Sequence, residues 1–338
     1  MASNNEEKIM PVGGQAVIEG VMMRSPKRIA TAVRRANGNI EVRVDEFQSL
    51  IQKHKSLNIP VLRGAITLIE VMIMGIKTLQ WSADKAMEDA EAQEAQKNPQ
   101  KAKKKKKKSG MSTAGAVFSL IIALGVGLAF FFVLPLYLTT EIFNIERQAL
   151  AFNLVAGLFR ILFFLLYVWG ISFMKDVHRL FEYHGAEHKT VFAFENKVVL
   201  SPENVQQFST YHPRCGTSFL VMVMLISLLF FALVDTIIML ATGQMSLFIR
   251  LAVHLPLIPV VGGISYEGLK ASANNIDNPL VRLLIAPGLW LQRITTQPPD
   301  NDQLEVAIVA LKTALGEDFA DELVSEPVIQ SQVVPVTL

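Results

Sequence analysis

Four long apolar segments constrain the fold of this chain more than any other feature. They run from Thr113 to Leu138, Ala149 to Phe173, Thr217 to Ala241 and Ser246 to Ile264. Each is long enough to cross a hydrocarbon core of about 30 Å as a helix. Because lipid offers no hydrogen-bond partner to an open backbone, such segments are expected to be helical. The sequence therefore predicts a mainly α membrane protein with about four transmembrane helices.

The basic residues predict how these helices are oriented. Lys101 and the run Lys103 to Lys108 directly precede the first span, and further lysines and arginines follow the second and fourth spans. The connection between the first two spans has Arg147 as its only basic residue. Since basic loops stay in the cytoplasm, we expect both termini and the central loop there. The single cysteine, Cys215, excludes an intrachain disulfide and fits a reducing compartment.

The remaining sequence is expected to form small elements around the spans. Ile29 to Arg35 and Ile40 to Val44 flank Asn37-Gly38, which predicts a small N-terminal β-hairpin. An amphipathic interfacial helix is predicted over Gly64 to Trp81, an interfacial or re-entrant piece over Leu280 to Leu291, and an amphipathic helix over Asn301 to Leu315. The expected divisions are 1–62, 63–83, a Lys-rich linker 84–112, spans 113–173, a cytosolic loop 174–216, spans 217–264 and a cytosolic segment 265–338.

The lysine run from Lys101 to Lys108 has two interpretations. Lysine binds phosphate without sequence preference, so the run fits a nucleic-acid arm. Its position beside a span favours attraction to the anionic headgroups of membrane lipids. We therefore expect lipids as partners and no specific nucleic acid.

The sequence His184-Gly185-Ala186-Glu187-His188 carries the clearest chemical signal. Two imidazoles four residues apart lie on one face of a helix, about 5–6 Å apart at Cβ. The order His-x-x-Glu-His is also a pattern of zinc hydrolases. It predicts His184 and His188 as ligands of a divalent metal and Glu187 as the general base. The donor types favour zinc. The competing interpretation is a pair of surface histidines beside a glutamate.

A catalytic zinc usually takes a third protein ligand. His212 and Cys215 stand directly before the third span, and Glu267 stands directly after the fourth. Each also has a structural interpretation: a helix cap for His212, an apolar filler for Cys215 and an ion pair for Glu267. Arg214 fits either a membrane anchor or a clamp for an anionic substrate. Asp176 and His178 precede the histidine pair, and Asp235 and His254 lie inside spans, where ionisable groups are often functional.

Four motifs resemble the YqhQ family of bacterial membrane proteins, which has no established function. They are GGQAVIEGVMMR at 13–24, YHGAEHK at 183–189, PRCGTSF at 213–219 and SYEG at 265–268. The resemblance implies a multi-pass protein of the bacterial cytoplasmic membrane, and the family is often described as metal-dependent. The positions that match its motifs are His184, Glu187, His188, His212, Arg214, Cys215 and Glu267, with Glu19 and Arg24 in the N-terminal motif. His178 and Tyr211 are further residues in or near the motifs. The lysine-rich linker is not part of the pattern.

Three classes of function remain open on this sequence. The first is a membrane-embedded zinc-type hydrolase with its site at the cytoplasmic face. The second is a non-enzymatic scaffold or regulator in which the same residues form a structural polar or metal cluster. The third is an oligomeric transporter or channel, which is disfavoured because four spans are few and no repeated half is visible.

Overall fold

The computed structural model describes residues 10–97, 113–273, 275 and 278–316. The lysine run at 101–108 and the tail beyond residue 316 lie outside the described residues. The expected attraction of that run to anionic headgroups therefore stays a prediction.

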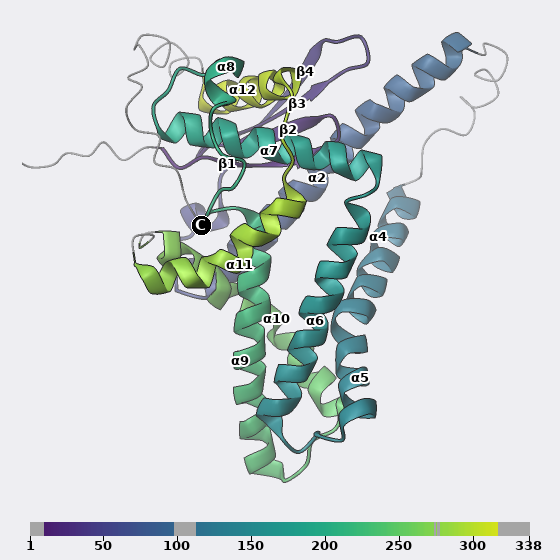
Figure 1. Ribbon diagram of the computed structural model, residues 1–338, viewed down its shortest axis with the longest axis vertical. Helices are drawn as coiled ribbons and strands as arrows, with labels where there is room; N and C mark the ends of the chain where they lie inside the picture. The colour runs from purple at the N-terminus through teal and green to yellow at the C-terminus, as the bar shows by residue number, and fades with distance from the viewer. Residues whose placement is uncertain (1–9, 98–112, 274, 276–277, 317–338) are drawn as a thin grey trace, which may run out of the picture.

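Four candidate spans form a helical bundle, as the sequence predicted (Figure 1). The first combines part of α4 (Thr113–Leu128), the π-helical η2 (Ala129–Val133) and α5 (Leu134–Phe143). The others are α6 (Ala149–Ile171), α9 (Gly216–Thr242) and α10 (Leu247–Ala273). The first candidate span covers Ile121–Phe143, so it begins later than the sequence suggested, and the fourth extends to Ser272.

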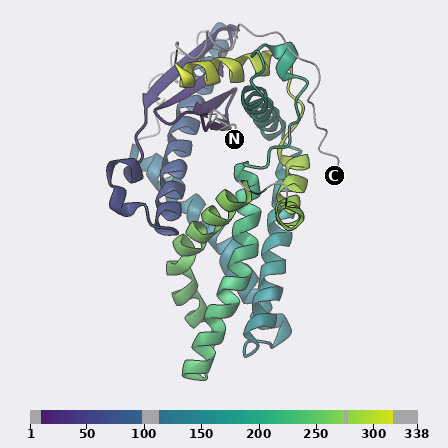
Figure 2. The same ribbon diagram turned by 90° about the vertical axis from the view of Figure 1, so that its left-hand side faces the viewer.

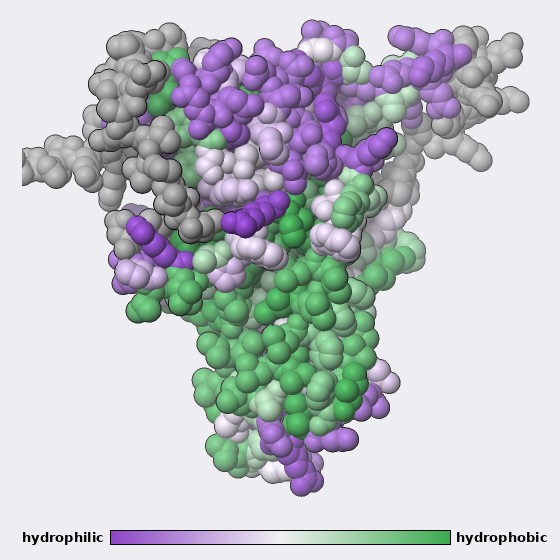
Figure 3. Space-filling view, viewed as in Figure 1, coloured by the Kyte–Doolittle hydropathy of each residue, from purple (hydrophilic) through white to green (hydrophobic). Residues whose placement is uncertain are grey.

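The outer surface of this bundle is apolar, as Figure 3 shows for one face. Hydrophilic residues gather at its two ends, over the sheet-containing part and over the opposite loops. This distribution suits helices surrounded by lipid, whose hydrocarbon excludes polar side chains. We call the end away from the sheet the distal end; it comprises the α5–α6 and α9–α10 connections.

The predicted hairpin is confirmed and is part of a larger sheet. Strands β3 (Arg28–Arg34) and β4 (Ile40–Glu46) pair around the Asn37-Gly38 turn. Two further strands, β1 (Gly13–Val17) and β2 (Gly20–Arg24), complete an antiparallel sheet of order β1-β2-β3-β4. The turn between β1 and β2 places Glu19 at φ 54°, a left-handed conformation that glutamate rarely adopts.

A long helix, α2 (Leu62–Lys97), connects the sheet region to the bundle. It follows two short elements, α1 (Leu50–Lys53) and η1 (Lys55–Leu57), and packs against α10 and β1. The helix includes the predicted amphipathic segment and continues to Lys97, through residues expected to form a linker. Alanine, glutamate, glutamine and lysine dominate this extension, and all four are good helix formers.

The sheet, α7 (Lys175–Glu195) and α12 (Asn301–Leu315) enclose the main core outside the bundle. Helix α12 lies across the sheet and α7 lies beside both (Figure 2). The predicted amphipathic helix is confirmed in α12, which Asp300 caps and which buries Leu304, Ile308 and Leu311. The helices α8 (Pro202–Val205) and α11 (Pro279–Thr295) complete the fold. Helix α11 includes the predicted interfacial piece and packs against α9. In Figure 1, α7 lies between α12 and the bundle.

Candidate functional site

The His-x-x-Glu-His motif lies in the buried half of α7. The first residues of this helix are exposed, whereas nearly every residue from Tyr183 to Phe194 is buried or half-buried. Gly185 allows the close approach of a crossing chain, because an added Cβ would stand 2.1 Å from the carbonyl oxygen of Gln297. The motif is therefore enclosed by other segments, which argues against a pair of surface histidines.

His184, His188 and Cys215 form a compact group of potential metal ligands. One donor atom from each lies within 4.8 Å of the others, and His184 Nε2 is 3.2 Å from Cys215 Sγ. The Nδ1 atoms of the two rings face the backbone carbonyls of Thr295 and Thr210. A carbonyl only accepts hydrogen bonds, so Nδ1 carries the proton in each ring and Nε2 keeps its lone pair. Carbonyl partners of this kind orient histidine ligands in metal sites.

The burial of His188 favours the neutral ring, which agrees with the lone pair assigned to its Nε2 atom. Its ring is 2 % exposed, and burial lowers its pKa, although the nearby Cys215 opposes the shift. Its Nε2 atom has no hydrogen-bond partner among the described residues. A neutral imidazole with a free lone pair, directed at a histidine and a cysteine, is the form of histidine that binds metals.

Cys215 reaches the group from the start of α9. It is the N-cap residue of that helix, and its sulfur accepts a hydrogen bond from the backbone N–H of Thr217. The side chain is buried. The end of a membrane span thus supplies the sulfur, while α7 supplies both rings.

Glu187 lies beside the ligand group on α7. Its Oε2 atom is 3.4 Å from Nε2 of His188, and the backbone of Gly14 in β1 donates a hydrogen bond to its carboxyl group. Burial raises the pKa of Glu187, against the opposing charges of the nearby histidines. An added Cβ at Gly14 would stand 2.9 Å from Glu187 Cγ, which explains a glycine in the N-terminal motif.

His212 lies next to this group but makes different contacts. Its ring centroid is 5.6 Å from that of His188, and its Nδ1 accepts a hydrogen bond from the backbone N–H of Arg214. Its Nε2 faces Glu195 Oε2 at 3.5 Å. Burial would raise the pKa of Glu195, but hydrogen bonding to His212 and the charge of Arg214 lower it overall. Glu195 also forms an ion pair with Arg214.

Glu195 and Gln292 were not among the residues that the sequence singled out. Both hold the loop between α8 and α9 in place. Gln292 of α11 accepts from the backbone N–H of His212 and donates to its carbonyl and to Ser218. Lys189 donates to the carbonyl of Phe208 at 2.6 Å. The only available signal was the spacing of Glu195, seven residues after His188 on the same helix. Nothing in the sequence near Gln292 indicated a partner in the loop.

The structure does not bring Glu267 into the ligand group. Both of its carboxylate oxygens pair with Arg63, at 2.6 and 2.5 Å, joining α10 to α2. An ion pair was one of the alternatives for Glu267, but its partner is Arg63, which the sequence had not indicated.

The other expected motif residues lie around the group and not within it. Arg24 lies over the ring of Phe47, 4.1 Å from its centroid. Glu19 holds Arg179 through two hydrogen bonds. The remaining positions are at the surface: His178 faces Glu182, and Tyr211 and Asp176 are exposed.

Comparison with known proteins gives a family but no activity. Residues 59–317 match the family model described as "Protein of unknown function (DUF1385)". The chain is also 34% identical over 333 residues to "Uncharacterized protein YqhQ" of Bacillus subtilis (strain 168), covering 96% of this chain and 98% of the relative. No solved structure matches the chain.

Proposed function

The chain belongs to the YqhQ family of unknown function, and from this premise we propose that it is a membrane-embedded, zinc-dependent hydrolase. In this proposal His184, His188 and Cys215 bind the metal. Glu187 is the general base, and the site faces the cytoplasm. The observation that carries the proposal is the grouping of three donor atoms within 4.8 Å of one another, two of them on rings oriented by backbone carbonyls.

The donor types suit zinc. Imidazole nitrogen and cysteine sulfur are the usual ligands of this metal, and a catalytic zinc keeps one position open beyond three protein ligands. With zinc held by these three residues, the site would supply a water with a pKa of about 7. Glu187 is close enough to the group to take a proton there, and burial raises the pKa of its carboxyl group, which makes its carboxylate a stronger base.

Residues at the border of the group have supporting roles in this proposal. Arg214 is partly exposed and provides a guanidinium for an anionic substrate, while Glu195 fixes its position. Glu195 also faces His212, whose ring lies next to that of His188. In this proposal His212 is a neighbour of the metal ligands and not one of them.

Metal analysis of the detergent-purified protein tests the proposal directly. We expect about one equivalent of zinc or cobalt in the wild-type protein, and thiolate-to-cobalt absorption in the cobalt form. Cys215→Ser should remove that absorption and most of the metal, whereas Glu267→Gln, a control outside the group, should keep both. Less than about a tenth of an equivalent in folded wild-type protein would contradict the metal site.

Glu187→Gln separates catalysis from metal binding. We expect it to keep the metal content of the wild type and to lower hydrolysis of an activated ester, such as 4-nitrophenyl acetate, by about 10²-fold or more. The comparison uses proteins with equal metal content. Equal rates in the two proteins would exclude Glu187 as the base.

A structural role for the same cluster is the second candidate. It is favoured by the direct contact between His184 Nε2 and Cys215 Sγ, which is a hydrogen bond when no metal is bound. In that case His184→Ala lowers the midpoint of thermal unfolding equally with and without added zinc. If the metal site is real, zinc raises the midpoint of the wild type and not that of the variant.

A further inference from the structure

A second group of ionisable residues lies inside the bundle, far from the sheet. Asp235 of α9 is fully buried and accepts three hydrogen bonds. The donors are Asn153 Nδ2 at 2.7 Å, Arg250 Nε at 2.9 Å and His254 Nε2 at 2.7 Å. They come from α6 and α10, so one carboxylate joins three spans near the distal end. We call these residues, together with Arg160, the distal cluster.

Arg160 adds a second guanidinium to this cluster. It is 7% exposed, and its Cζ lies 4.6 Å from the centroid of Phe132 and 6.0 Å from that of Phe231. His254 stacks on the same Phe231 at 4.0 Å. Arg160 and His254 therefore contact the same aromatic rings.

The charges of the distal cluster do not balance. Two arginines, which stay charged in proteins, stand against the single carboxylate of Asp235. Among the described residues, Nε and Nη2 of Arg160 and Nη1 of Arg250 have no hydrogen-bond partner, and neither has Nδ1 of His254. An excess positive charge with unused donors is costly at membrane depth, where such groups usually serve a function.

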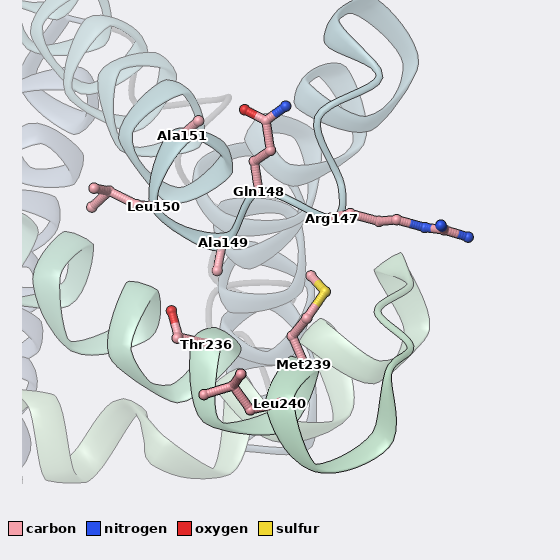
Figure 4. Close-up of a pocket in the computed structure, with 8 residues that line it drawn as sticks. All are labelled: Arg147, Gln148, Ala149, Leu150, Ala151, Thr236, Met239 and Leu240. Carbon is pink, nitrogen blue, oxygen red and sulfur yellow. The ribbon is translucent and has the colours of Figure 1, made fainter.

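The distal surface next to the cluster is hollowed. One open pocket of about 540 Å³ is lined by Thr140, Glu141 and residues 144–148. Among these is Glu146, whose backbone carbonyl accepts a hydrogen bond from Arg250 Nη2 at 2.7 Å. A second pocket, of about 410 Å³, is lined by Thr236, the neighbour of Asp235, and by the start of α6 (Figure 4). In Figure 4 the side chain of Arg147 extends away from the other lining residues. Arg250 thus contacts the backbone of one pocket wall, and Asp235 directly precedes a residue that lines the other pocket.

We propose that the distal cluster binds a phosphate-type oxyanion through Arg160 and Arg250. The guanidinium group matches the oxygens of such an anion and donates two parallel hydrogen bonds. One negative charge would balance the excess positive charge of the cluster. The anion is either free phosphate or the phosphate of an anionic lipid, since both present the same chemistry. This site is independent of the proposed metal site.

Two measurements test the site and identify the source of the anion. In the first, calorimetry follows inorganic phosphate binding to lipid-stripped protein in detergent. In the second, native mass spectrometry follows retention of phosphatidylglycerol by protein taken from mixed phosphatidylglycerol and phosphatidylcholine nanodiscs. Each compares the wild type with Arg160→Gln and with Arg43→Gln, which removes an exposed arginine of β4.

We expect binding in at least one measurement, weakened at least tenfold by Arg160→Gln and unchanged by Arg43→Gln. Phosphate binding identifies a free anion, and lipid retention without it identifies a lipid. The bound anion should raise the unfolding midpoint of the wild type but not of Arg160→Gln. If Arg160→Gln fails to fold, Arg160→Lys keeps the charge, removes the planar fork and should show the same loss. No binding in either measurement, or equal binding by wild type and variant, overturns the proposal.

Discussion

Asp235→Ala is expected to cost the protein about 3–5 kcal/mol of stability, because it leaves a buried arginine without its partner. The carboxylate is fully buried and is hydrogen-bonded to Arg250, His254 and Asn153. Its removal leaves two guanidinium groups inside the bundle with no negative charge among the described cluster residues. Reversible unfolding in detergent, followed by far-ultraviolet circular dichroism, measures the loss.

Two controls distinguish this effect from a general loss of charge. Asp45→Asn removes an exposed carboxylate that pairs with Arg43 at the surface, and it should cost less than about 1 kcal/mol. The double variant Asp235→Ala/Arg250→Met removes both members of the buried pair and should be more stable than Asp235→Ala alone. A single variant as stable as the Asp45 control would show that the three hydrogen bonds contribute little.

Gly185→Ala is expected to separate α7 from the segment that follows α11. The new methyl group would stand 2.1 Å from the carbonyl oxygen of Gln297 and 3.3 Å from Thr210 Cγ2. A backbone carbonyl cannot move aside like a flexible side chain, so the two segments must shift. The hydrogen bond from Gln297 N to the carbonyl of Phe181 lies in the same contact. We expect a loss of about 1–3 kcal/mol in unfolding experiments.

Gly170→Ala provides the matched control within a helix. No atom lies within 4 Å of an added Cβ at Gly170, so that variant should be as stable as the wild type or slightly more stable. Gly185→Ala should also lower cobalt binding if the proposed metal site exists, because it displaces the segment that carries Thr295. Equal stability of the two variants would contradict the close packing at Gly185.

The parts of the fold that local sequence determines could be predicted. Membrane spans depend on length and hydrophobicity, and α12 on a capping residue and its apolar spacing, so each was visible in one segment. The β3–β4 hairpin had its Asn-Gly turn. The β1–β2 turn was not predicted, because Ile18-Glu19 has none of the usual turn residues. Glu19 adopts a left-handed conformation there, which glutamate rarely does.

The site was only partly predictable, for a different reason. His184 and His188 are four residues apart, so helical geometry alone places them together. Cys215 and Glu267 were equivalent candidates in sequence, since both stand at ends of spans. Only Cys215 joins the ligand group, because Arg63, more than two hundred residues before Glu267, pairs with the Glu267 carboxylate. Backbone carbonyls such as that of Thr295 carry no side-chain signal at all.

The contact between His184 and the carbonyl of Thr295 has a consequence for biosynthesis. Thr295 ends α11, and the ribosome makes it after all four candidate spans and after both histidines. The imidazole of residue 184 therefore acquires its orienting partner only after all four candidate spans have been made. A nascent chain that stops before this threonine can contain all four candidate spans and still lack the carbonyl that orients His184.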